Sequence, residues 1–422
     1  MDKFLIEKSP PLAGKVRVSG AKNSCLALMA ASLLTDEPVV LENVPDLVDV
    51  RTMGRVLENI GVRVTYEPGY IKLDASCAEG YNAPYEMVRT MRASYYVLGP
   101  LTARKGKAEV SLPGGCAIGQ RPIDLHLKGL SMLGAQISTA RGYIYTQAGK
   151  LRGSRINISS PRGSSVGATV NLMLAASLAK GETVLDGAAR EPEIEDLARM
   201  LTEMGAKIEG AGTDKVVIKG VSSLGGAVHH VIPDRIEAGT FAVAAAITRG
   251  DVIIQECLPE HFQAVLDLLE ILGVRIERGK KILRVRSDAG LPSFSLLTEP
   301  YPGFPTDMQA QFCALATQAK GVSRIEETIF ENRFLHVPEL VRLGADIQVS
   351  GNRLIVRGPT ALSSAPVMAS DLRASAALVL AALVAEGTSE ISRIYHLDRG
   401  YEHLEVKLVR LGAKIVRVSE SG

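Results

Sequence analysis

A short phrase recurs six times along this chain, and it limits the possible folds more than any other feature. In each copy a helical run ends in an apolar residue and a glycine, followed by Ala or Val, one further residue, and Ile or Val. The six glycines lie 68 to 73 residues apart: Gly61, Gly134, Gly205, Gly273, Gly344 and Gly412. Glycine in this place is typical of a helix C-cap that leads into a strand. Because the period exceeds the roughly 20–50 residues of solenoid repeats, the six units are expected to form closed domains.

Each unit also contains, earlier in its sequence, a helix that is apolar on nearly every face. These helices are predicted over residues 25–34, 94–102, 168–179, 239–248, 310–319 and 375–385. A helix without a polar face is buried on all sides. Strands such as 215–219 and 353–357 alternate instead and are expected to be half exposed. The pattern predicts two inside-out α/β barrel domains, each of three repeated sheet-helix units with helices buried and strands outside.

The length of the chain indicates two domains. At 422 residues it exceeds the roughly 250–300 at which one hydrophobic core stops growing, and six units divide evenly into three and three. We predict one domain over residues 22–231, carrying a mobile cysteine loop at 112–122, and a second over 1–21 plus 232–422. Residues 221–232 are the predicted hinge, and the first residues are expected to add a strand to the second domain. The active site is expected in the cleft between the domains.

Composition excludes several classes of function. The 48 Lys and Arg nearly balance 46 Asp and Glu, so the net charge is only +2 and does not indicate a protein that binds nucleic acid. Five cysteines without CxxC pairing, and no apolar signal segment, predict a cytoplasmic protein with free thiols. The longest apolar stretch, residues 374–385, is shorter than the roughly 20 residues of a membrane span, so no membrane insertion is expected.

Cations stand at the entrances of the buried helices. Five of the six entrances carry one, and the sixth carries Asp307; the cations are Lys22, Arg92, Arg162, Arg235 and Arg373. A cation beside the positive end of a helix dipole is unfavourable unless an anion offsets it, so the pattern predicts anionic ligands. The alternative is that individual arginines pair with neighbouring carboxylates. A second set follows the next strand, namely Arg121, Arg190, Arg333 and Arg399, and the two sets together predict binding of a multiply charged phosphate ester.

No motif in the sequence points to a metal or a cofactor. There is neither a Walker A nor a GxGxxG segment, and the seven histidines show no HExxH spacing. His229 and His230 are adjacent and would point apart on a strand. We therefore expect no metal site and no cofactor.

Two residues are candidates for proton transfer. Cys116 lies in the inserted loop with glycines on both sides, and the nearby Arg121 would favour a thiolate. It is a candidate nucleophile or acid, and the alternative is a spare surface thiol. Asp307 is the carboxylate among the cations and therefore the candidate general base, with a helix N-cap as the alternative. Asp371 is expected to orient the guanidinium of Arg373.

Five motifs, in order along the chain, resemble the UDP-N-acetylglucosamine 1-carboxyvinyltransferases of the enolpyruvyl transferase family. They are Gly20-Ala21-Lys22-Asn23-Ser24, Pro113-Gly114-Gly115-Cys116-Ala117-Ile118-Gly119-Gln120-Arg121-Pro122, Pro305-Thr306-Asp307-Met308-Gln309-Ala310-Gln311, Glu331-Asn332-Arg333-Phe334 and Asp398-Arg399-Gly400-Tyr401. The likeness implies a bacterial cytoplasmic transferase that moves the enolpyruvyl group of phosphoenolpyruvate to the 3-hydroxyl of UDP-N-acetylglucosamine and releases phosphate. This is the first committed step of peptidoglycan synthesis, which links the family to cell-wall biogenesis, cell shape and cell division. It implies two small-molecule substrates and no nucleic-acid partner, and it leaves protein partners unknown.

The resemblance also implies addition followed by elimination, through a tetrahedral ketal. In this mechanism Asp307 takes the hydroxyl proton and Cys116 protonates C3 of phosphoenolpyruvate. Cys116 is also where the family forms a covalent phosphoenolpyruvate adduct and is alkylated by fosfomycin. The residues implied to hold phosphoenolpyruvate, or to support its site electrostatically, are Lys22, Asn23, Arg92, Arg121 and Arg399. Arg333, Asp371 and Arg373 complete the predicted substrate-binding set.

Three segments are implied to hold the nucleotide sugar. They are Arg121, Pro122, Ile123, Asp124 and Leu125 for the uridine, Ser164, Ser165, Val166 and Gly167 for the diphosphate, and Thr306, Asp307 and Ile329 for the sugar. One departure is visible, because many relatives carry a lysine where Gly163 stands here. The neighbouring Arg162 is the candidate to make that diphosphate contact.

Two rival functions are weighed against this interpretation. A shikimate-pathway enolpyruvyl transferase shares the fold and the phosphoenolpyruvate chemistry, but it lacks this cysteine loop and its first motif differs from Lys22-Asn23-Ser24. A non-catalytic repeat scaffold, such as a ring around nucleic acid, would need a basic channel, which the nearly neutral charge opposes.

Overall fold

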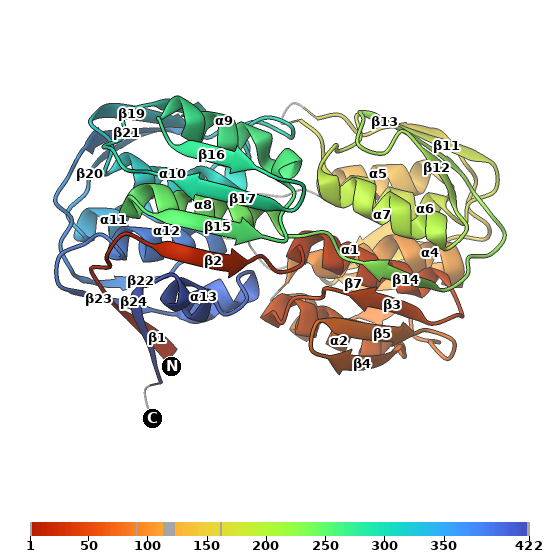
Figure 1. The fold of residues 1–422 in the computed structure, drawn as a ribbon. Helices are drawn as coiled ribbons and strands as arrows, with labels where there is room; N and C mark the ends of the chain where they lie inside the picture. The colour runs from red at the N-terminus through yellow and green to blue at the C-terminus, as the bar shows by residue number, and fades with distance from the viewer. Residues whose placement is uncertain (1, 90, 113–122, 161–162, 420–422) are drawn as a thin grey trace. The chain divides into compact units, whose positions relative to one another are not determined.

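The chain folds into two compact units, as the computed structural model shows (Figure 1). The structure describes residues 2–89, 91–112, 123–160 and 163–419. One unit, here the Lys22 unit, contains the described residues from Gly20 to Ile232, and the other, the Asp307 unit, contains those up to Ser19 and from Pro233 onwards. The chain therefore passes from one unit to the other after Ser19 and again after Ile232.

Each unit contains three four-stranded sheets of one design within the part of the chain that is described. The first strand of each sheet is parallel to the second, the second is antiparallel to the third, and the third is antiparallel to the fourth. In the Lys22 unit the sheets run β14 (Ala227–His230), β3 (Val39–Glu42), β5 (Tyr70–Asp74), β4 (Arg63–Glu67); β6 (Asn82–Ala83), β7 (Lys107–Ser111), β9 (Tyr143–Gln147), β8 (Gln136–Ala140); and β10 (Arg155–Asn157), β11 (Glu182–Asp186), β13 (Lys215–Lys219), β12 (Lys207–Glu209). In the Asp307 unit they run β2 (Ala13–Arg17), β15 (Asp251–Gln255), β17 (Ile282–Arg286), β16 (Arg275–Arg278); β18 (Ser295–Leu297), β19 (Gly321–Glu326), β21 (Arg353–Gly358), β20 (Asp346–Ser350); and β22 (Pro366–Met368), β23 (Thr388–Ser392), β1 (Asp2–Glu7), β24 (Lys414–Ser419).

Every repeat contributes one deeply buried helix and one helix that ends at the repeat glycine. The buried helices are α1 (Lys22–Ala31), α4 (Leu98–Lys105), α6 (Val166–Ala176), α8 (Arg235–Thr248), α10 (Gln309–Ala316) and α12 (Leu372–Ala382). The second set is α2 (Val48–Ile60), α5 (Asp124–Met132), α7 (Pro192–Glu203), α9 (Gln263–Ile271), α11 (Val337–Arg342) and α13 (Leu404–Arg410). Shorter helical segments are α3 (Tyr85–Val88) and the 3-10 helices η1 (Ser32–Leu34), η2 (Arg92–Val97), η3 (Pro259–Phe262), η4 (Thr306–Met308) and η5 (Ile394–Arg399).

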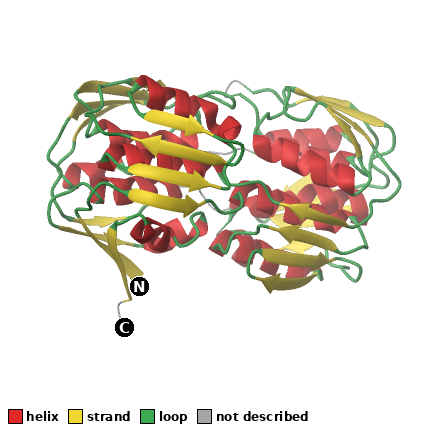
Figure 2. Cartoon of the chain, in the orientation of Figure 1, coloured by secondary structure: helices red, strands yellow, loops and turns green. Residues whose placement is uncertain are grey.

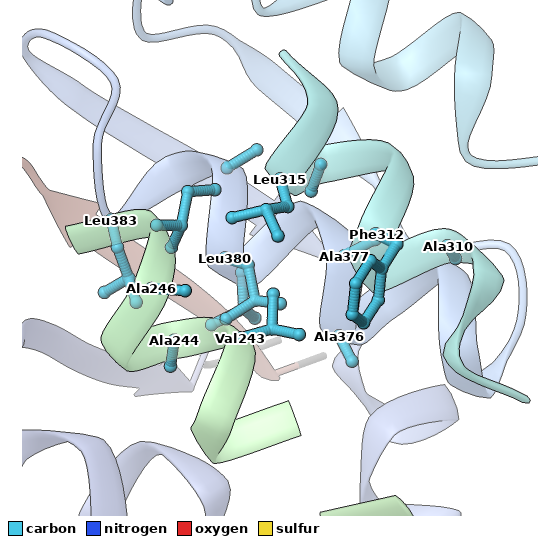
Figure 3. Packing of buried hydrophobic residues seen from close by; sticks show 14 of the residues in the cluster. Val243, Ala244, Ala246, Ala310, Phe312, Leu315, Ala376, Ala377, Leu380 and Leu383 are labelled. Carbon is cyan, nitrogen blue, oxygen red and sulfur yellow. The ribbon is translucent and has the colours of Figure 1, made fainter. Parts of the chain in front are cut away.

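The predicted inversion of the usual α/β layering is confirmed. In each unit the strands lie outside and the apolar helices lie beneath them (Figure 2). All residues of α8 are buried, and its side chains, such as Ala244 and Ala246, lie in one core with Leu315 of α10 and Leu380 of α12 (Figure 3). The sheets remain separate, so that among the described strands three sheets, and no closed barrel, surround the helices of each unit. No described helix has both the length and the apolar character needed to cross a membrane.

The repeat glycines act as the sequence predicts. All six have a positive φ, between 86° and 102°. A left-handed residue at the end of a helix is disfavoured for side chains with a Cβ, so glycine is selected at each of these ends. The recurring phrase therefore marks the same helix-to-strand turn in every repeat.

Two repeats exchange their first strands where the chain passes between the units. β2 precedes α1 in the sequence but pairs in parallel with β15, and β14 precedes α8 but pairs in parallel with β3. Part of the predicted hinge at 221–232 is therefore a sheet strand. The predicted N-terminal strand is found as well, because β1 lies between β23 and β24 and closes the sheet of the last repeat.

Candidate active site

In the Asp307 unit, Asp307 lies beside two buried arginines. Its Oδ1 accepts a hydrogen bond from Arg333 Nη2 at 2.5 Å, and Arg373 Nε lies 3.6 Å from the same oxygen. The side chains of both arginines are 6% exposed and that of Asp307 is 27% exposed, so the carboxylate is the accessible member of the group. The alternative role of helix N-cap is wrong, because Pro305 and Met308 occupy the two N-cap positions of η4 and α10.

The charge state of Asp307 follows from these neighbours. Burial raises the pKa of the carboxyl, but Arg373 and Arg333 lower it by more, with Arg235 adding to the effect, so the pKa lies well below its usual range. Asp307 is therefore ionised at neutral pH. The arginines were predicted to await an anion, and in this structure two of them share a carboxylate instead.

The segment that carries Asp307 is fixed from both sides. Phe304 packs edge-on against Phe312 of α10, with ring centroids 4.9 Å apart. Thr306 donates to Glu327 Oε2 at 2.8 Å and accepts from Arg333 Nη1 at 3.0 Å. Glu327 also accepts the backbone N–H of Ile329 at 2.8 Å, which joins the two segments predicted to bind the sugar.

Asp371 acts on the backbone of α12. Its Oδ1 accepts the N–H groups of Arg373 and Ala374 at 2.9 and 3.0 Å, so it is the N-cap of the helix. The expectation that it orients the guanidinium is replaced by this capping role, which fixes the start of the helix from which Arg373 projects. The Arg373 guanidinium lies 5.4 Å from the centroid of the Tyr401 ring, and its Nη1 has no hydrogen-bond partner among the described residues.

Arg399 is the last residue of η5 and is half-buried. The residue before it, Asp398, pairs with Arg417 of β24 at 2.5 Å, and Arg417 also pairs with Asp2 of β1 at 2.8 Å. The Asp398-Arg399-Gly400-Tyr401 motif is thus anchored to the strand that the N-terminus adds to this sheet.

In the Lys22 unit, Lys22 begins α1 and its Nζ lies 3.3 Å from Asp49 Oδ2. The two side chains are 12% and 4% exposed. Asp49 stands in the first turn of α2 and was not predicted as a site residue. A carboxylate on the buried side of an otherwise apolar helix face was the signal in the sequence that could have identified it.

The segments predicted to hold the nucleotide lie at the starts of α5 and α6. Ser165 is the N-cap of α6 and accepts the N–H of Ala168 at 3.2 Å, while Ser164 precedes it. Ile123 is the N-cap of α5, followed by Asp124 and Leu125 in its first turn. A Cβ at Gly167 would lie 3.0 Å from His126 Cε1, so glycine permits the close approach of the two helices.

Several predicted residues lie outside the described part of the chain, namely Cys116, Arg121, Pro122 and Arg162. The backbone of Arg92 begins η2. Arg190 donates to the carbonyl of Gly212 at 3.4 Å and is exposed. Cys25, Cys257 and Cys313 are buried and Cys77 is exposed.

Comparison with known proteins identifies the family. The family model for EPSP synthase (3-phosphoshikimate 1-carboxyvinyltransferase) matches residues 6–408. UDP-N-acetylglucosamine 1-carboxyvinyltransferase of Koribacter versatilis (strain Ellin345) is 55% identical and the alignment covers 100% of this chain and 97% of that protein. The protein of the same name from Geotalea uraniireducens (strain Rf4) is 54% identical, with 100% of both chains covered. The chain belongs to the enolpyruvyl transferase family.

Solved structures of enolpyruvyl transferases have the same fold. The enolpyruvyl transferase NikO from Streptomyces tendae has a TM-score of 0.89 at 28% identity, covering 99% of this chain and 98% of that one. An EPSP synthase from Acinetobacter baumannii has a TM-score of 0.76 at 19% identity, covering 99% of this chain and 100% of that one. The second likeness concerns the fold alone, because the identity is low.

The Arg333–Asp307 pair gives a testable prediction for stability. Arg333→Met should lower the free energy of unfolding at pH 7 by about 3 kcal/mol, because the variant leaves Asp307 with one fewer counter-charge. A carboxyl with a depressed pKa contributes stability above its unfolded value of 3.8 and loses it as pH falls through the folded value. The difference between variant and wild type should therefore be constant above about pH 4 and shrink below it.

Urea unfolding across this pH range measures the effect. The matched control is Arg353→Met, which breaks the exposed Arg353–Glu326 pair of the same unit and should cost at most about 1 kcal/mol. Equal losses in both variants would show that Asp307 does not depend on Arg333 for its charge.

Proposed function

We propose that this chain transfers the enolpyruvyl group of phosphoenolpyruvate to the 3-hydroxyl of UDP-N-acetylglucosamine and releases phosphate. The observation that carries the proposal is the 55% identity, over the whole chain, to a protein named for this reaction. The ionised Asp307 beside Arg333 and Arg373 supports it, since the reaction needs a base among groups that bind anions. The proposal places the protein in the bacterial cytoplasm, at the first committed step of peptidoglycan synthesis.

In the addition step the sugar hydroxyl oxygen bonds to C2 of phosphoenolpyruvate while Asp307 takes its proton. C3 gains a proton from Cys116, and a tetrahedral ketal results. In the elimination step C3 returns a proton to the Cys116 thiolate, the C–O bond breaks as phosphate leaves with its electron pair, and the double bond between C2 and C3 re-forms. Proton transfers of this kind contribute about 10²–10⁴-fold each to a rate. The proposal uses no metal and no other cofactor.

The low pKa of Asp307 sets a condition on this mechanism. A carboxylate held by two arginines is a weak base, because the two cations stabilise its ionised form. An anionic substrate that draws Arg333 or Arg373 toward itself would raise the pKa of Asp307. Binding of the substrates would therefore activate the base.

The remaining roles follow the charges. Lys22, Arg121 and Arg399 hold the phosphate and carboxylate of phosphoenolpyruvate, with Asn23 beside them and Arg92 in support. The starts of α5 and α6 hold the uridine and the diphosphate through backbone N–H groups and Ser165. Thr306 and Ile329, joined through Glu327, hold the sugar.

The experiment that tests the proposal is phosphate release from phosphoenolpyruvate by the purified chain. One reaction receives UDP-N-acetylglucosamine and the other shikimate 3-phosphate, since the matching family model carries the name of the second reaction. Release only with the nucleotide sugar supports the proposal. Release only with shikimate 3-phosphate would overturn it in favour of the rival transferase, and release with neither would favour a non-catalytic repeat protein.

A further inference from the structure

A buried network of polar side chains joins α1, which begins at Lys22, to α7 and β14 in the Lys22 unit. The reaction described above does not use this network. Its centre is Asp196 of α7, which is fully buried. Asp196 Oδ2 accepts from Ser24 Oγ at 2.5 Å and from the backbone N–H of Ile232 at 3.3 Å. Asp196 Oδ1 accepts from Arg199 Nη2 at 2.6 Å and lies 3.0 Å from His229 Nε2. This carboxylate thus has four donors from three different segments.

The protonation of His229 follows from its contacts. Its Nε2 faces Asp196, and its Nδ1 lies 2.8 Å from Glu203 Oε2. An ionised carboxylate only accepts hydrogen bonds, so both ring nitrogens make favourable contacts only when both carry a proton. The imidazolium form is therefore the one that fits this network, and His229 links β14 to α7 through two carboxylates.

The helix that begins at Lys22 lacks the usual stabilisation of its first turn. Its N-cap residue is Ala21, which offers no side-chain acceptor, and no acidic residue stands in the first turn. Three of the other buried helices, α6, α8 and α12, have side-chain caps from Ser165, Asp234 and Asp371. Lys22 itself adds a positive charge at the positive end of the helix dipole. The start of α1 must therefore be held by contacts outside the helix.

Asp196 supplies those contacts along two routes. Ser24, the third residue of α1, is bonded to it directly. Ala21 donates its N–H to the carbonyl of Ile232 at 2.7 Å, and the N–H of Ile232 returns to Asp196. Lys22 and Asn23 lie in the sequence between Ala21 and Ser24, the two residues that these contacts hold. α7 also packs against both α1 and β14, so the network connects elements that are already in contact.

We propose that Asp196, with Ser24 and His229, is a positioning anchor for the first turn of α1, which holds Lys22 and Asn23 in place for phosphoenolpyruvate. The inference rests on the proposed function for the role of Lys22, but the anchor itself is a property of the unliganded protein. Asp196 and His229 are positioning residues, since they act through α1 and have no part in the chemistry. Removing the anchor should weaken phosphoenolpyruvate binding more than it weakens the fold.

The decisive comparison is Ser24→Ala against Ser32→Ala. Both serines are fully buried, and Ser32 begins η1 directly after the same helix, where its hydroxyl donates to the carbonyl of Met29 at 2.7 Å. Each variant loses one buried hydroxyl, at opposite ends of the helical segment. Ser24→Ala should raise KM for phosphoenolpyruvate about tenfold, the loss expected for one hydrogen bond to a buried carboxylate, and change kcat much less. Ser32→Ala should lower thermal stability similarly and leave KM unchanged.

A second readout does not depend on catalysis. Competitive acetylation of the free protein with acetic anhydride, followed by mass spectrometry, reports the environment of the Lys22 amine. Ser24→Ala should change the labelling rate of Lys22, and Ser32→Ala should not. Unchanged labelling and unchanged KM in Ser24→Ala would overturn the anchor. Absence of phosphate release in the wild type would overturn the proposed function instead, and the labelling result would still decide the anchor.

The anchor also predicts a pH dependence. Burial lowers the pKa of His229, but Asp196 and Glu203 raise it by more, so its net shift is upward. The charged groups in contact with His229 are Asp196 and Glu203 of α7. Arg199 of α7 and Cys25 of α1 interact with Asp196, and Glu42 of β3 pairs with His230 instead. A group whose pKa is raised by folding gives its full stabilisation at pH values below its pKa in the unfolded chain. It loses that stabilisation as the pH rises through its pKa in the folded protein. KM for phosphoenolpyruvate should therefore rise on the alkaline side, and His229→Gln should remove that rise. An identical pH profile in His229→Gln would contradict the part assigned to His229.

Discussion

Replacing Asp307 with asparagine should lower kcat for phosphate release by about 10²–10⁴-fold, the contribution typical of a general base. The amide has the shape of the carboxylate but cannot take the hydroxyl proton. It also leaves Arg333 and Arg373 without their shared anion, so anionic ligands should bind at least as well as before. Steady-state assays give kcat, and calorimetric titration with UDP-N-acetylglucosamine gives the affinity. Asp307→Ala should likewise retain nucleotide-sugar binding better than it retains turnover.

The control for this prediction is Asp251→Asn. Asp251 of β15 accepts two hydrogen bonds from Arg284, at 2.8 and 2.7 Å, so it is a second Asp–Arg pair in the same unit but on the outer sheet. This variant should leave kcat within about twofold of wild type, since exposed pairs contribute little. If Asp307→Asn lost affinity and turnover in equal proportion, its role would be binding alone.

Much of the fold could be predicted from the sequence, because the determining signals are local. The repeat glycines, the apolar helices and the alternating strands each reflect contacts within one repeat. The exchange of β2 and β14 could not be predicted in the same way. Both strands fit the first position of either sheet, and the choice depends on pairing with segments more than 180 residues away. The position of β1 was expected only in outline, because the first residues precede the first repeat and could add a strand to the other domain.

The residues of the candidate site likewise fall into those that could be predicted from the sequence and those that could not. Asp307, Arg333 and Arg373 could be identified because charged residues recur at the same places in the repeats, and the structure brings these three together. Their supporting residue Glu327 could not be identified, since it acts through contacts between separate segments. Asp49, which contacts Lys22, did have a signal in the sequence, because it is a carboxylate on the buried side of an apolar helix face. Asp371 was assigned to the guanidinium of Arg373, whereas it bonds the backbone N–H of that residue. Sequence spacing indicates that two residues are near each other but not which atoms meet.

Cys116→Ser should lower kcat by about 10²–10⁴-fold without unfolding the protein. Cys116 lies outside the described residues, so this prediction rests on the glycine-flanked loop and on the family resemblance. A thiol can donate a proton to C3, whereas a serine hydroxyl of nearly the same shape is a far weaker acid. Cys116→Ala should lose as much, because it has no proton to give. Thermal unfolding of both variants checks that the loss is chemical.

The other thiols make Cys116 separately measurable. Burial raises the pKa of Cys25, Cys313 and Cys257, the last to about 12, so these three should stay protonated and unreactive at pH 8. Cys77 is exposed, and Cys77→Ala removes it as a competitor while serving as the matched control for turnover. In this variant iodoacetamide should modify Cys116 alone, and activity should fall in step with that modification. Full turnover in Cys116→Ser, or full activity after Cys116 is alkylated, would exclude the thiol as the acid and leave the protonation of C3 to another group.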